Sequence, residues 1–67
     1  MAVMKVIELM AQSEKSWEDA ARQALAAAAK SVRGIKSVYI QDFSMVVEGD
    51  SVAAYRVNAK VTFEVEI

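Results

Sequence analysis

The C-terminal quarter of the chain alternates between apolar and polar side chains with a period of two. Between residues 52 and 67, one parity is apolar and carries Ala53, Tyr55, Val57, Ala59, Val61, Phe63, Val65 and Ile67. The other parity is mainly polar and carries Ala54, Arg56, Asn58, Lys60, Thr62, Glu64 and Glu66. Successive side chains of a strand point to opposite faces of its sheet. The pattern therefore predicts a long strand with one buried and one polar face.

Two other segments also have the pattern of strands. Residues 2–10 carry apolar side chains on both parities, which favours a strand that contacts its own helix on one face and a neighbouring copy on the other. Residues 35–47 form a second long extended segment in which neither face is cleanly polar. One parity carries Ser37, Tyr39, Gln41, Phe43 and Met45, and the other carries Val38, Ile40, Asp42, Ser44 and Val46. The turn sequence Glu-Gly-Asp-Ser at 48–51 predicts an antiparallel hairpin between this segment and the last strand.

A helix is predicted between the first two strands, after a polar turn at 11–15. Ser16 is the expected N-cap, with Ser13 as the alternative, because serine hydroxyls accept hydrogen bonds from the first helical turn. Gly34 is a candidate for the C′ position after the helix. A single apolar stripe follows helical spacing and consists of Trp17, Ala20, Ala21, Ala24, Leu25, Ala28 and Val32. Because the stripe is mostly alanine, the helix can lie close to a sheet.

These elements predict one α+β domain over residues 1–67, with the order β-α-β-β. Strands of about 13 to 16 residues reach roughly 45 to 50 Å, whereas a helix of about 16 residues is ~24 Å long. One helix cannot cover such a sheet. The chain is also 55% hydrophobic, although a domain of this size buries only about 60% of its unfolded surface. We therefore expect identical copies to cover the remaining apolar surface.

Composition excludes several classes of function. The chain has no Cys and no His, which excludes disulfides and zinc, haem or iron–sulfur sites with their ordinary ligands, while oxygen-ligated hard cations stay possible. The net charge is −1, with basic and acidic residues intermixed, so no nucleic-acid partner is expected. The sequence contains no apolar run of about 18 residues and no secretion signal, so we expect a cytoplasmic protein without a membrane partner.

Candidate catalytic chemistry is scarce. The serines have no evident activating partner and the two glycines are isolated, so the chain is not expected to be an enzyme. The polar row around Arg56, Asn58 and Lys60 either binds an anionic or hydrogen-bonding ligand or faces water and other subunits. Trp17 is either a platform for a ligand ring or, the interpretation we favour, a structural anchor. Carboxylates at Glu8, Glu48 and Asp50 are possible calcium ligands, but they do not form an EF-hand pattern.

Three strings cover nearly the whole chain and together resemble the dodecins: KVIELMAQSEKSWEDAARQAL, VRGIKSVYIQDFSMVV and YRVNAKVTFEVEI. The resemblance implies a three-stranded antiparallel sheet that wraps around one helix. It also implies assembly into a hollow homododecamer. Dodecins of this kind are non-enzymatic flavoproteins that store or buffer flavins, so FMN or riboflavin is the ligand that the resemblance implies.

Flavin contacts of the family are altered in this chain. Flavin-binding members stack a Trp of the second strand on the isoalloxazine ring, where this chain has Ser37. They hydrogen-bond the ring with a Gln after the Tyr of the third strand, where Arg56 stands, and some carry a basic residue for the flavin phosphate, where Ser44 stands. The resemblance therefore implies weaker flavin binding, in a pocket lined by Ser37, Tyr39, Gln41, Ser44 and Arg56.

The pairs Ser16-Trp17 and Tyr55-Arg56, without a Trp in the second strand, resemble the variant branch called calcium dodecins. That resemblance implies calcium as a second possible ligand, and it assigns no metal ligands to residues of this chain. The alternative function is a calcium-binding or purely structural dodecin-like assembly that binds no flavin.

Overall fold

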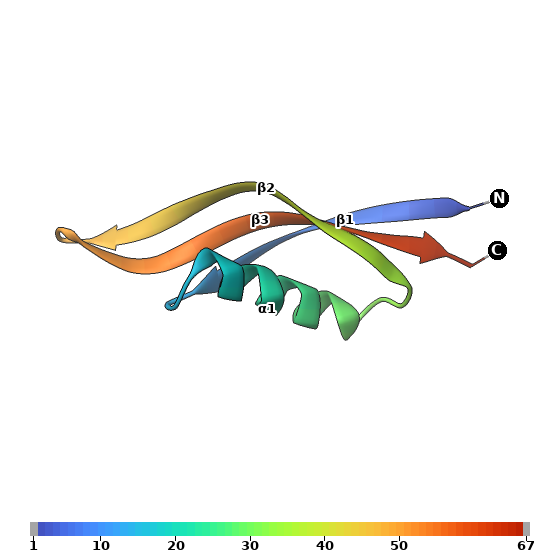
Figure 1. The fold of residues 1–67 in the computed structure, drawn as a ribbon, viewed down its shortest axis with the longest axis horizontal. Coiled ribbons are helices and arrows are strands. Elements are labelled where there is room, and N and C mark those ends of the chain that lie inside the picture. The colour runs from blue at the N-terminus through green and yellow to red at the C-terminus, as the bar shows by residue number, and fades with distance from the viewer. Residues whose placement is uncertain (1, 67) are drawn as a thin grey trace.

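A computed structural model describes residues 2–66 as one sheet and one helix. The elements are β1 (Val3–Ser13), α1 (Trp17–Ala29), β2 (Ile35–Glu48) and β3 (Ser51–Val65). The helix lies against one face of the sheet, and the β2–β3 turn projects beyond it at the end opposite the chain termini (Figure 1). The predicted α+β class and β-α-β-β order are confirmed.

The alternating strand β3 occupies the centre of the sheet. The strand order is β1-β3-β2, and both neighbours are antiparallel to β3. The predicted hairpin between β2 and β3 is therefore confirmed, and Gly49 at its turn has a φ of 61°, which glycine adopts without a steric penalty. A central strand with one face against a helix needs the regular alternation that this segment shows.

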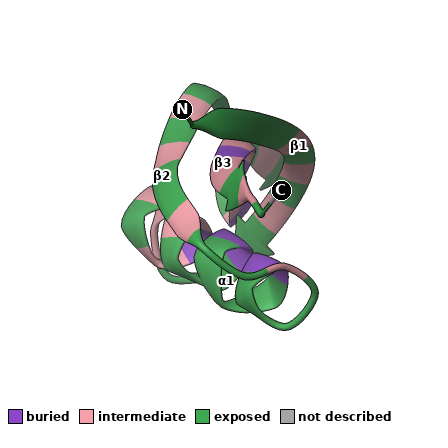
Figure 2. Cartoon of the chain, turned by 90° about the vertical axis from the view of Figure 1, so that its right-hand side faces the viewer, coloured by how far each residue is buried: buried purple, intermediate pink, exposed green. Residues whose placement is uncertain are grey.

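The core is a narrow layer between α1 and β3. Its buried residues are alanines at 20, 24 and 28 of the helix and Val57, Ala59 and Val61 of β3. These residues face one another as the purple bands of α1 and β3 in Figure 2. The apolar parity of β3 is thus the core face, as predicted. Ala54 is the exception on the polar parity, since only 3% of it is exposed.

One residue of the predicted helical stripe lies outside the core. Leu25 is 42% exposed, whereas the alanine immediately before it is buried. Neighbouring helix residues differ by about 100° around the axis, so Leu25 lies on the flank of the stripe. The residues of α1 that the sheet buries are the alanines spaced four residues apart.

Two predicted boundaries were wrong. The segment 11–13 belongs to β1 and not to a turn, because its residues pair with Val57, Arg56 and Tyr55 of β3. The helix ends earlier than its apolar stripe, and Lys30 is the C-cap. Gly34 is therefore not at C′; it has a φ of 75°, and its carbonyl accepts a 3.0 Å hydrogen bond from the Glu64 amide. This positive φ favours glycine at the entry to β2, whereas a Cβ there would make only an ordinary contact, 3.4 Å from the Glu64 carbonyl oxygen.

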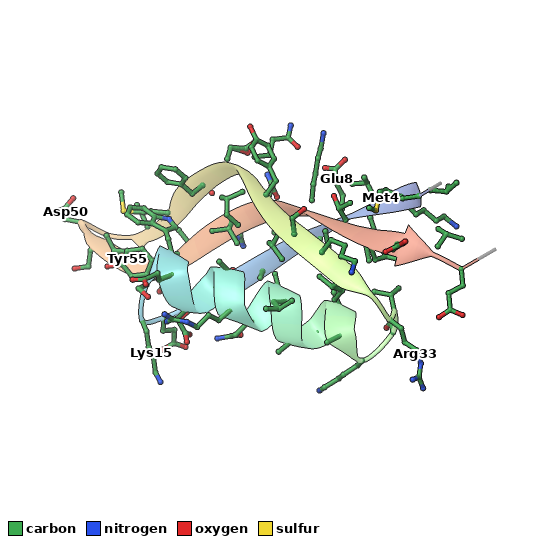
Figure 3. All side chains as sticks on the ribbon, turned by 45° about the vertical axis from the view of Figure 1, so that its right-hand side comes forward. Met4, Glu8, Lys15, Arg33, Asp50 and Tyr55 are labelled. Carbon is green, nitrogen blue, oxygen red and sulfur yellow. The ribbon has the colours of Figure 1, made fainter. Side chains whose placement is uncertain are left out.

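Large apolar side chains stay exposed along the strands, as the difference in length between strands and helix predicts. The molecule is 51 Å long. The exposed set includes Val3, Met4, Val6, Met10, Tyr39, Phe43, Met45, Val47 and Val52. In Figure 3, Met4 and Glu8 lie on the side of the sheet away from α1. One chain therefore leaves much of its apolar sheet surface uncovered.

The entry to the helix is held by a network of hydroxyls around Asp19. Ser16 is the N-cap, as predicted, and its Oγ accepts a 2.9 Å hydrogen bond from the Asp19 amide. Buried Ser13 has another role, since its Oγ donates to Asp19 Oδ2 at 2.6 Å and accepts from the Lys15 amide. The hydrogen bond from Ser13 and a second from Gln23 lower the pKa of Asp19 below its usual value.

This network predicts a loss of stability in acid. Because the folded-state pKa of Asp19 lies below its unfolded value, its contribution is complete above pH about 4 and is lost as the pH falls through the folded-state pKa. Asp19→Asn should lower the unfolding temperature at pH 7 and flatten its decrease below pH about 4. Thermal unfolding followed by circular dichroism across this range checks the result. Asp50→Asn, in the exposed hairpin turn, is the control and should keep the wild-type acid dependence.

Candidate functional site

The face of the sheet opposite α1, here called the helix-distal face, carries the polar parity of β3. Directly opposed residues of an antiparallel pair share a face, so the register defines rows of side chains across the three strands. In the order β1, β3, β2, the rows are Gln12–Arg56–Ser44, Met10–Asn58–Asp42, Glu8–Lys60–Tyr39 and Val6–Thr62–Ser37. Polar groups thus run along the middle and the β2 side of this face, and apolar side chains alternate with polar ones on β1.

Irregular pairing of β2 determines which of its residues reach the helix-distal face. The register with β3 shifts between Ile35 and Ser37 and again between Ile40 and Asp42. After the second shift Asp42 is opposite Asn58, and the next residue, Phe43, is opposite Val57 on the core side. The predicted grouping of residues 37, 39, 41, 43 and 45 on one face was therefore wrong. An extra residue in one strand moves every later side chain of that strand to the opposite face of the sheet.

Four of the five predicted pocket residues share the helix-distal face. Ser37, Tyr39 and Ser44 come from β2 and Arg56 comes from β3. Gln41 lies within the register shift and has no partner on β3. Tyr39 is 63% exposed, so its ring is an available aromatic surface on this face.

The structure brings Ser44 next to Arg56 and separates both from Ser37. Ser44 is directly opposite Arg56, whereas Ser37 is opposite Thr62, six residues further along β3. At about 3.3 Å per residue this separation is roughly 20 Å. A ring-sized ligand cannot contact Ser37 and Arg56 of the same chain at once.

Arg56 is held in position by Gln12, which was expected to lie in the turn at 11–15. Its Nε donates a 2.7 Å hydrogen bond to Gln12 Oε1 on β1. Within residues 2–66 the ion pairs are Arg22–Glu18 and Lys36–Glu64, so Arg56 has no carboxylate partner in this part of the chain. Continuing the period of two along β1 as far as residue 12 would have identified Gln12.

The remaining polar groups of this face are partly paired. Asn58 Nδ2 donates to Asp42 Oδ1 at 3.1 Å. Lys60 has Glu8 and Tyr39 as its neighbours in the same row. Lys60 thus has an acidic residue in its row, whereas Arg56 has none.

Trp17 packs against the sheet on the face that α1 covers, near Ser44 and Tyr55. Its ring centroid lies 5.2 Å from that of Phe43 and 5.0 Å from that of Tyr55, which packs edge-on. Its indole N–H also donates a 2.9 Å hydrogen bond to the Ser44 carbonyl. In Figure 3, Tyr55 lies beside the first turn of α1. Trp17 thus fixes β2 to the start of the helix, which agrees with the structural role favoured from the sequence.

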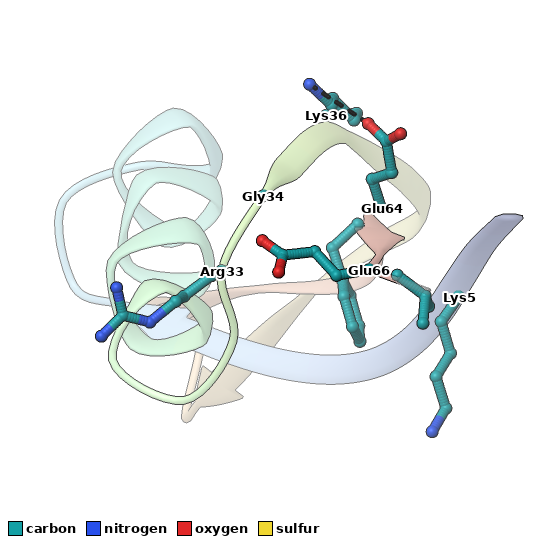
Figure 4. Close-up of a pocket in the computed structure, with 8 residues that line it drawn as sticks. Lys5, Arg33, Gly34, Lys36, Glu64 and Glu66 are labelled. Atoms are coloured by element: carbon teal, nitrogen blue, oxygen red, sulfur yellow. Dashed lines mark ion pairs between the residues drawn. The ribbon is translucent and has the colours of Figure 1, made fainter. Parts of the chain in front are cut away.

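A hollow lies at the end of the sheet near the chain termini (Figure 4). Its lining includes Lys5, Arg33 and Lys36 together with Phe63, Glu64 and Glu66. Lys36 Nζ lies 3.6 Å from Glu64 Oε1, and Lys5 and Arg33 point outward. The sequence does not reveal this site, because its charged residues come from three separate stretches of the chain. Three cations and two carboxylates line this hollow, so groups of both charges are available to a ligand there.

Calcium ligands do not gather within one chain. Among residues 2–66, no three acidic side chains lie close enough together to hold a metal ion. Glu8 lies within β1, Glu48 ends β2 and Asp50 lies in the hairpin turn. Within residues 2–66, these three carboxylates therefore do not form a common calcium site. In the same part of the chain, α1 is too short to cross a membrane.

Comparison with known proteins gives a consistent result. The dodecin family profile matches residues 3–66. The chain is 34% identical over 64 residues to the calcium dodecin of Mycobacterium tuberculosis, with 96% of this chain and 90% of that protein covered. The crystal structure of that calcium dodecin, described as calcium-chelating with a calcium-binding site, superposes with a TM-score of 0.83 at 32% identity, covering 96% of this chain and 91% of the other.

A mutant of the Thermus thermophilus dodecin superposes with a TM-score of 0.94 at 30% identity, and both chains are covered completely. Sequence and fold therefore agree over the described elements. The chain belongs to the dodecin family, and within that family it is similar to calcium dodecin.

Proposed function

We propose that this chain assembles into a hollow, non-enzymatic homododecamer of the dodecin type that binds or stores a small ligand on the helix-distal faces of its sheets. The family match over residues 3–66 carries the proposal. The exposed apolar side chains of the sheet support it, because a single helix leaves them in water.

The separation of the pocket residues supports binding between copies. Ser37 and Arg56 share the helix-distal face but lie roughly 20 Å apart along β3. A pocket that uses both positions has to combine Ser37 of one copy with Arg56 of another. The site is then incomplete in the monomer, and ligand binding depends on assembly.

Assembly is tested by static light scattering coupled to gel filtration at micromolar concentration. We expect a mass about twelve times the 7.3 kDa of the chain. A monomer in this measurement would contradict both the dodecameric shell and a pocket shared between copies.

Flavin is the ligand that we propose for this pocket, as FMN or riboflavin. Arg56, Ser44 and Asn58 offer hydrogen-bonding groups for the polar edge and side chain of a flavin, and Tyr39 offers an aromatic ring. Ser37 in place of a tryptophan removes a stacking partner, which contributes about 1 to 3 kcal/mol per ring in related base-stacking sites. We therefore expect quenching of flavin fluorescence in the micromolar range of protein, and absence of quenching at several hundred micromolar would exclude flavin.

Calcium is the second candidate, favoured by the similarity to a calcium dodecin. Since no three acidic residues gather within residues 2–66, the site would combine carboxylates of different copies. Isothermal titration of the assembled protein with calcium should then release or absorb heat, and EGTA should lower the unfolding temperature. If neither change occurs, the calcium function is wrong.

A further inference from the structure

We infer that the end of the β2–β3 hairpin of one copy docks into the hollow near the chain termini of a second copy, so that the two copies meet head to tail. The inference rests on the proposed assembly of the chain into a closed shell. It adds the two surfaces that meet and the charges that select them.

The hairpin end carries an apolar patch that α1 does not cover. The patch, here called the hairpin patch, consists of side chains that are each 45% to 64% exposed: Phe43, Met45, Val47 and Val52. The 13 residues of α1 span only about 20 Å of the 51 Å molecule, and the hairpin projects beyond the start of the helix (Figure 1). A contiguous apolar surface of this kind on a small protein marks an interaction site.

The strand register places the whole hairpin patch on the α1 side of the sheet. Positions 43 and 45 of β2 pair with the parity of β3 that faces α1. The next register shift skips Ala53 of β3, so β2 keeps its own alternation as far as Val47. Val47 therefore lies on the α1 side too, and so does its partner Val52.

The hollow near the termini offers a matching surface at the other end of the same face. Phe63 and Val65 continue the parity of β3 that faces α1, and both are only half-buried. Lys5 is opposite Phe63 and Arg33 follows α1, so two cations flank this apolar floor. The hollow has a volume of about 850 Å³, within the roughly 300–1,000 Å³ of ligand sites in proteins, and it has room for the side chains of a hairpin tip.

Charge favours the unlike end as the partner of the hairpin. Residues 37–55, which include the hairpin tip, contain three acidic residues and no basic one. Contact between two hairpin ends would therefore bring like charges together, which is unfavourable. A basic surface on the second copy avoids this repulsion.

Cations at the hollow are available to such an acidic partner. One of the three cations of the lining is already paired with a carboxylate, but Lys5 and Arg33 have no ion pair within residues 2–66. Glu66 is the remaining carboxylate of the lining and offsets only one of these two charges. Glu48, the last residue of β2, follows the hairpin patch along the strand and is the acid that docking brings toward them.

Contact between unlike surfaces is compatible with a closed shell. Such contacts generate rings when the rotation between copies closes. Each copy then uses its hairpin end once and its hollow once. Both ends of the sheet face that α1 leaves uncovered are buried in this way.

Reversal of charge on each surface tests the inference. Glu48→Lys should raise the protein concentration at which half of the chains are assembled by about tenfold, because like charges then face each other at every such contact. The double variant Lys5→Glu with Arg33→Glu should weaken assembly in the same way, and combining all three substitutions should restore it. Light scattering over a dilution series measures each midpoint. Glu14→Lys, in the exposed turn before α1, is the control and should leave the midpoint unchanged.

A carboxylate placed in the hairpin patch is an independent test. Val47→Glu should leave the fold intact, since 57% of Val47 is exposed, and should prevent assembly. Ala26→Glu adds the same group on the exposed surface of α1 and should leave assembly unchanged. Circular dichroism shows that each variant is folded.

Failure of this inference is distinct from failure of the proposed function. If the wild type assembles and both Glu48→Lys and Val47→Glu assemble equally well, the shell stands and the docking surface is wrong. If each charge reversal weakens assembly but the combined variant does not recover it, the hairpin does not meet the hollow and the inference is overturned. A monomeric wild type would contradict the assembly itself and the inference with it.

Discussion

Replacing Ala24 with leucine should destabilise the protein by about 1 to 3 kcal/mol, because the new side chain has no space between α1 and β3. Only 2% of Ala24 is exposed, and it lies midway between the buried alanines at 20 and 28. The opposing positions Val57, Ala59 and Val61 are themselves buried. The helix would have to move away from the sheet, and this would expose the small core, most of which lies between α1 and β3.

Thermal unfolding measures this effect against a matched control. Each kcal/mol lowers the unfolding temperature by about 4 to 8 °C in a domain of this size. Ala26→Leu makes the same chemical change at an exposed position of α1 and should shift the unfolding temperature by only a few degrees. Equal shifts for the two variants would show that the alanine stripe does not determine how closely the helix approaches the sheet.

The sequence predicts the core because the core depends on local periodicity. The alternation in β3 identifies its buried face, and the spacing of the alanines identifies the helical face. The end of β1 could not be found in this way, because residues 11–13 are strand through backbone pairing with β3 and not through their own hydrophobicity. Residue propensity and hydrophobic pattern predict a strand poorly where pairing with another strand determines the structure.

The candidate site was harder to predict than the core, because it depends on the register of β2. The shift between Ile40 and Asp42 moves Ser44 onto the face that carries Ser37 and Tyr39 and moves Phe43 toward Trp17. No turn residue in the sequence marks this position. The family resemblance assigned Ser44 and Arg56 to one pocket, and the register shows that they are neighbours within one chain. It also places Ser37 six residues from Arg56 along β3, which is why the proposed pocket combines residues of different copies.

Restoring the stacking residue should increase flavin affinity more than any other single change. Ser37→Trp adds an aromatic surface worth about 1 to 3 kcal/mol, so we expect riboflavin to bind at least about tenfold more tightly. Riboflavin is a suitable probe because it carries the stacking ring without a phosphate group. Adding Arg56→Gln places an amide at the position after Tyr55 and should increase riboflavin affinity further.

The control is Ser31→Trp, which places a tryptophan at an exposed position after α1 and outside the helix-distal face. It should leave riboflavin affinity unchanged in the same fluorescence titration. If Ser37→Trp also leaves it unchanged while the assembly is intact, residue 37 does not line the pocket. This is a strict test because the register shifts between Ile35 and Ser37. If the pairing of residue 37 were displaced by one residue, the new ring would point toward α1. A large side chain there would destabilise the core instead of binding flavin.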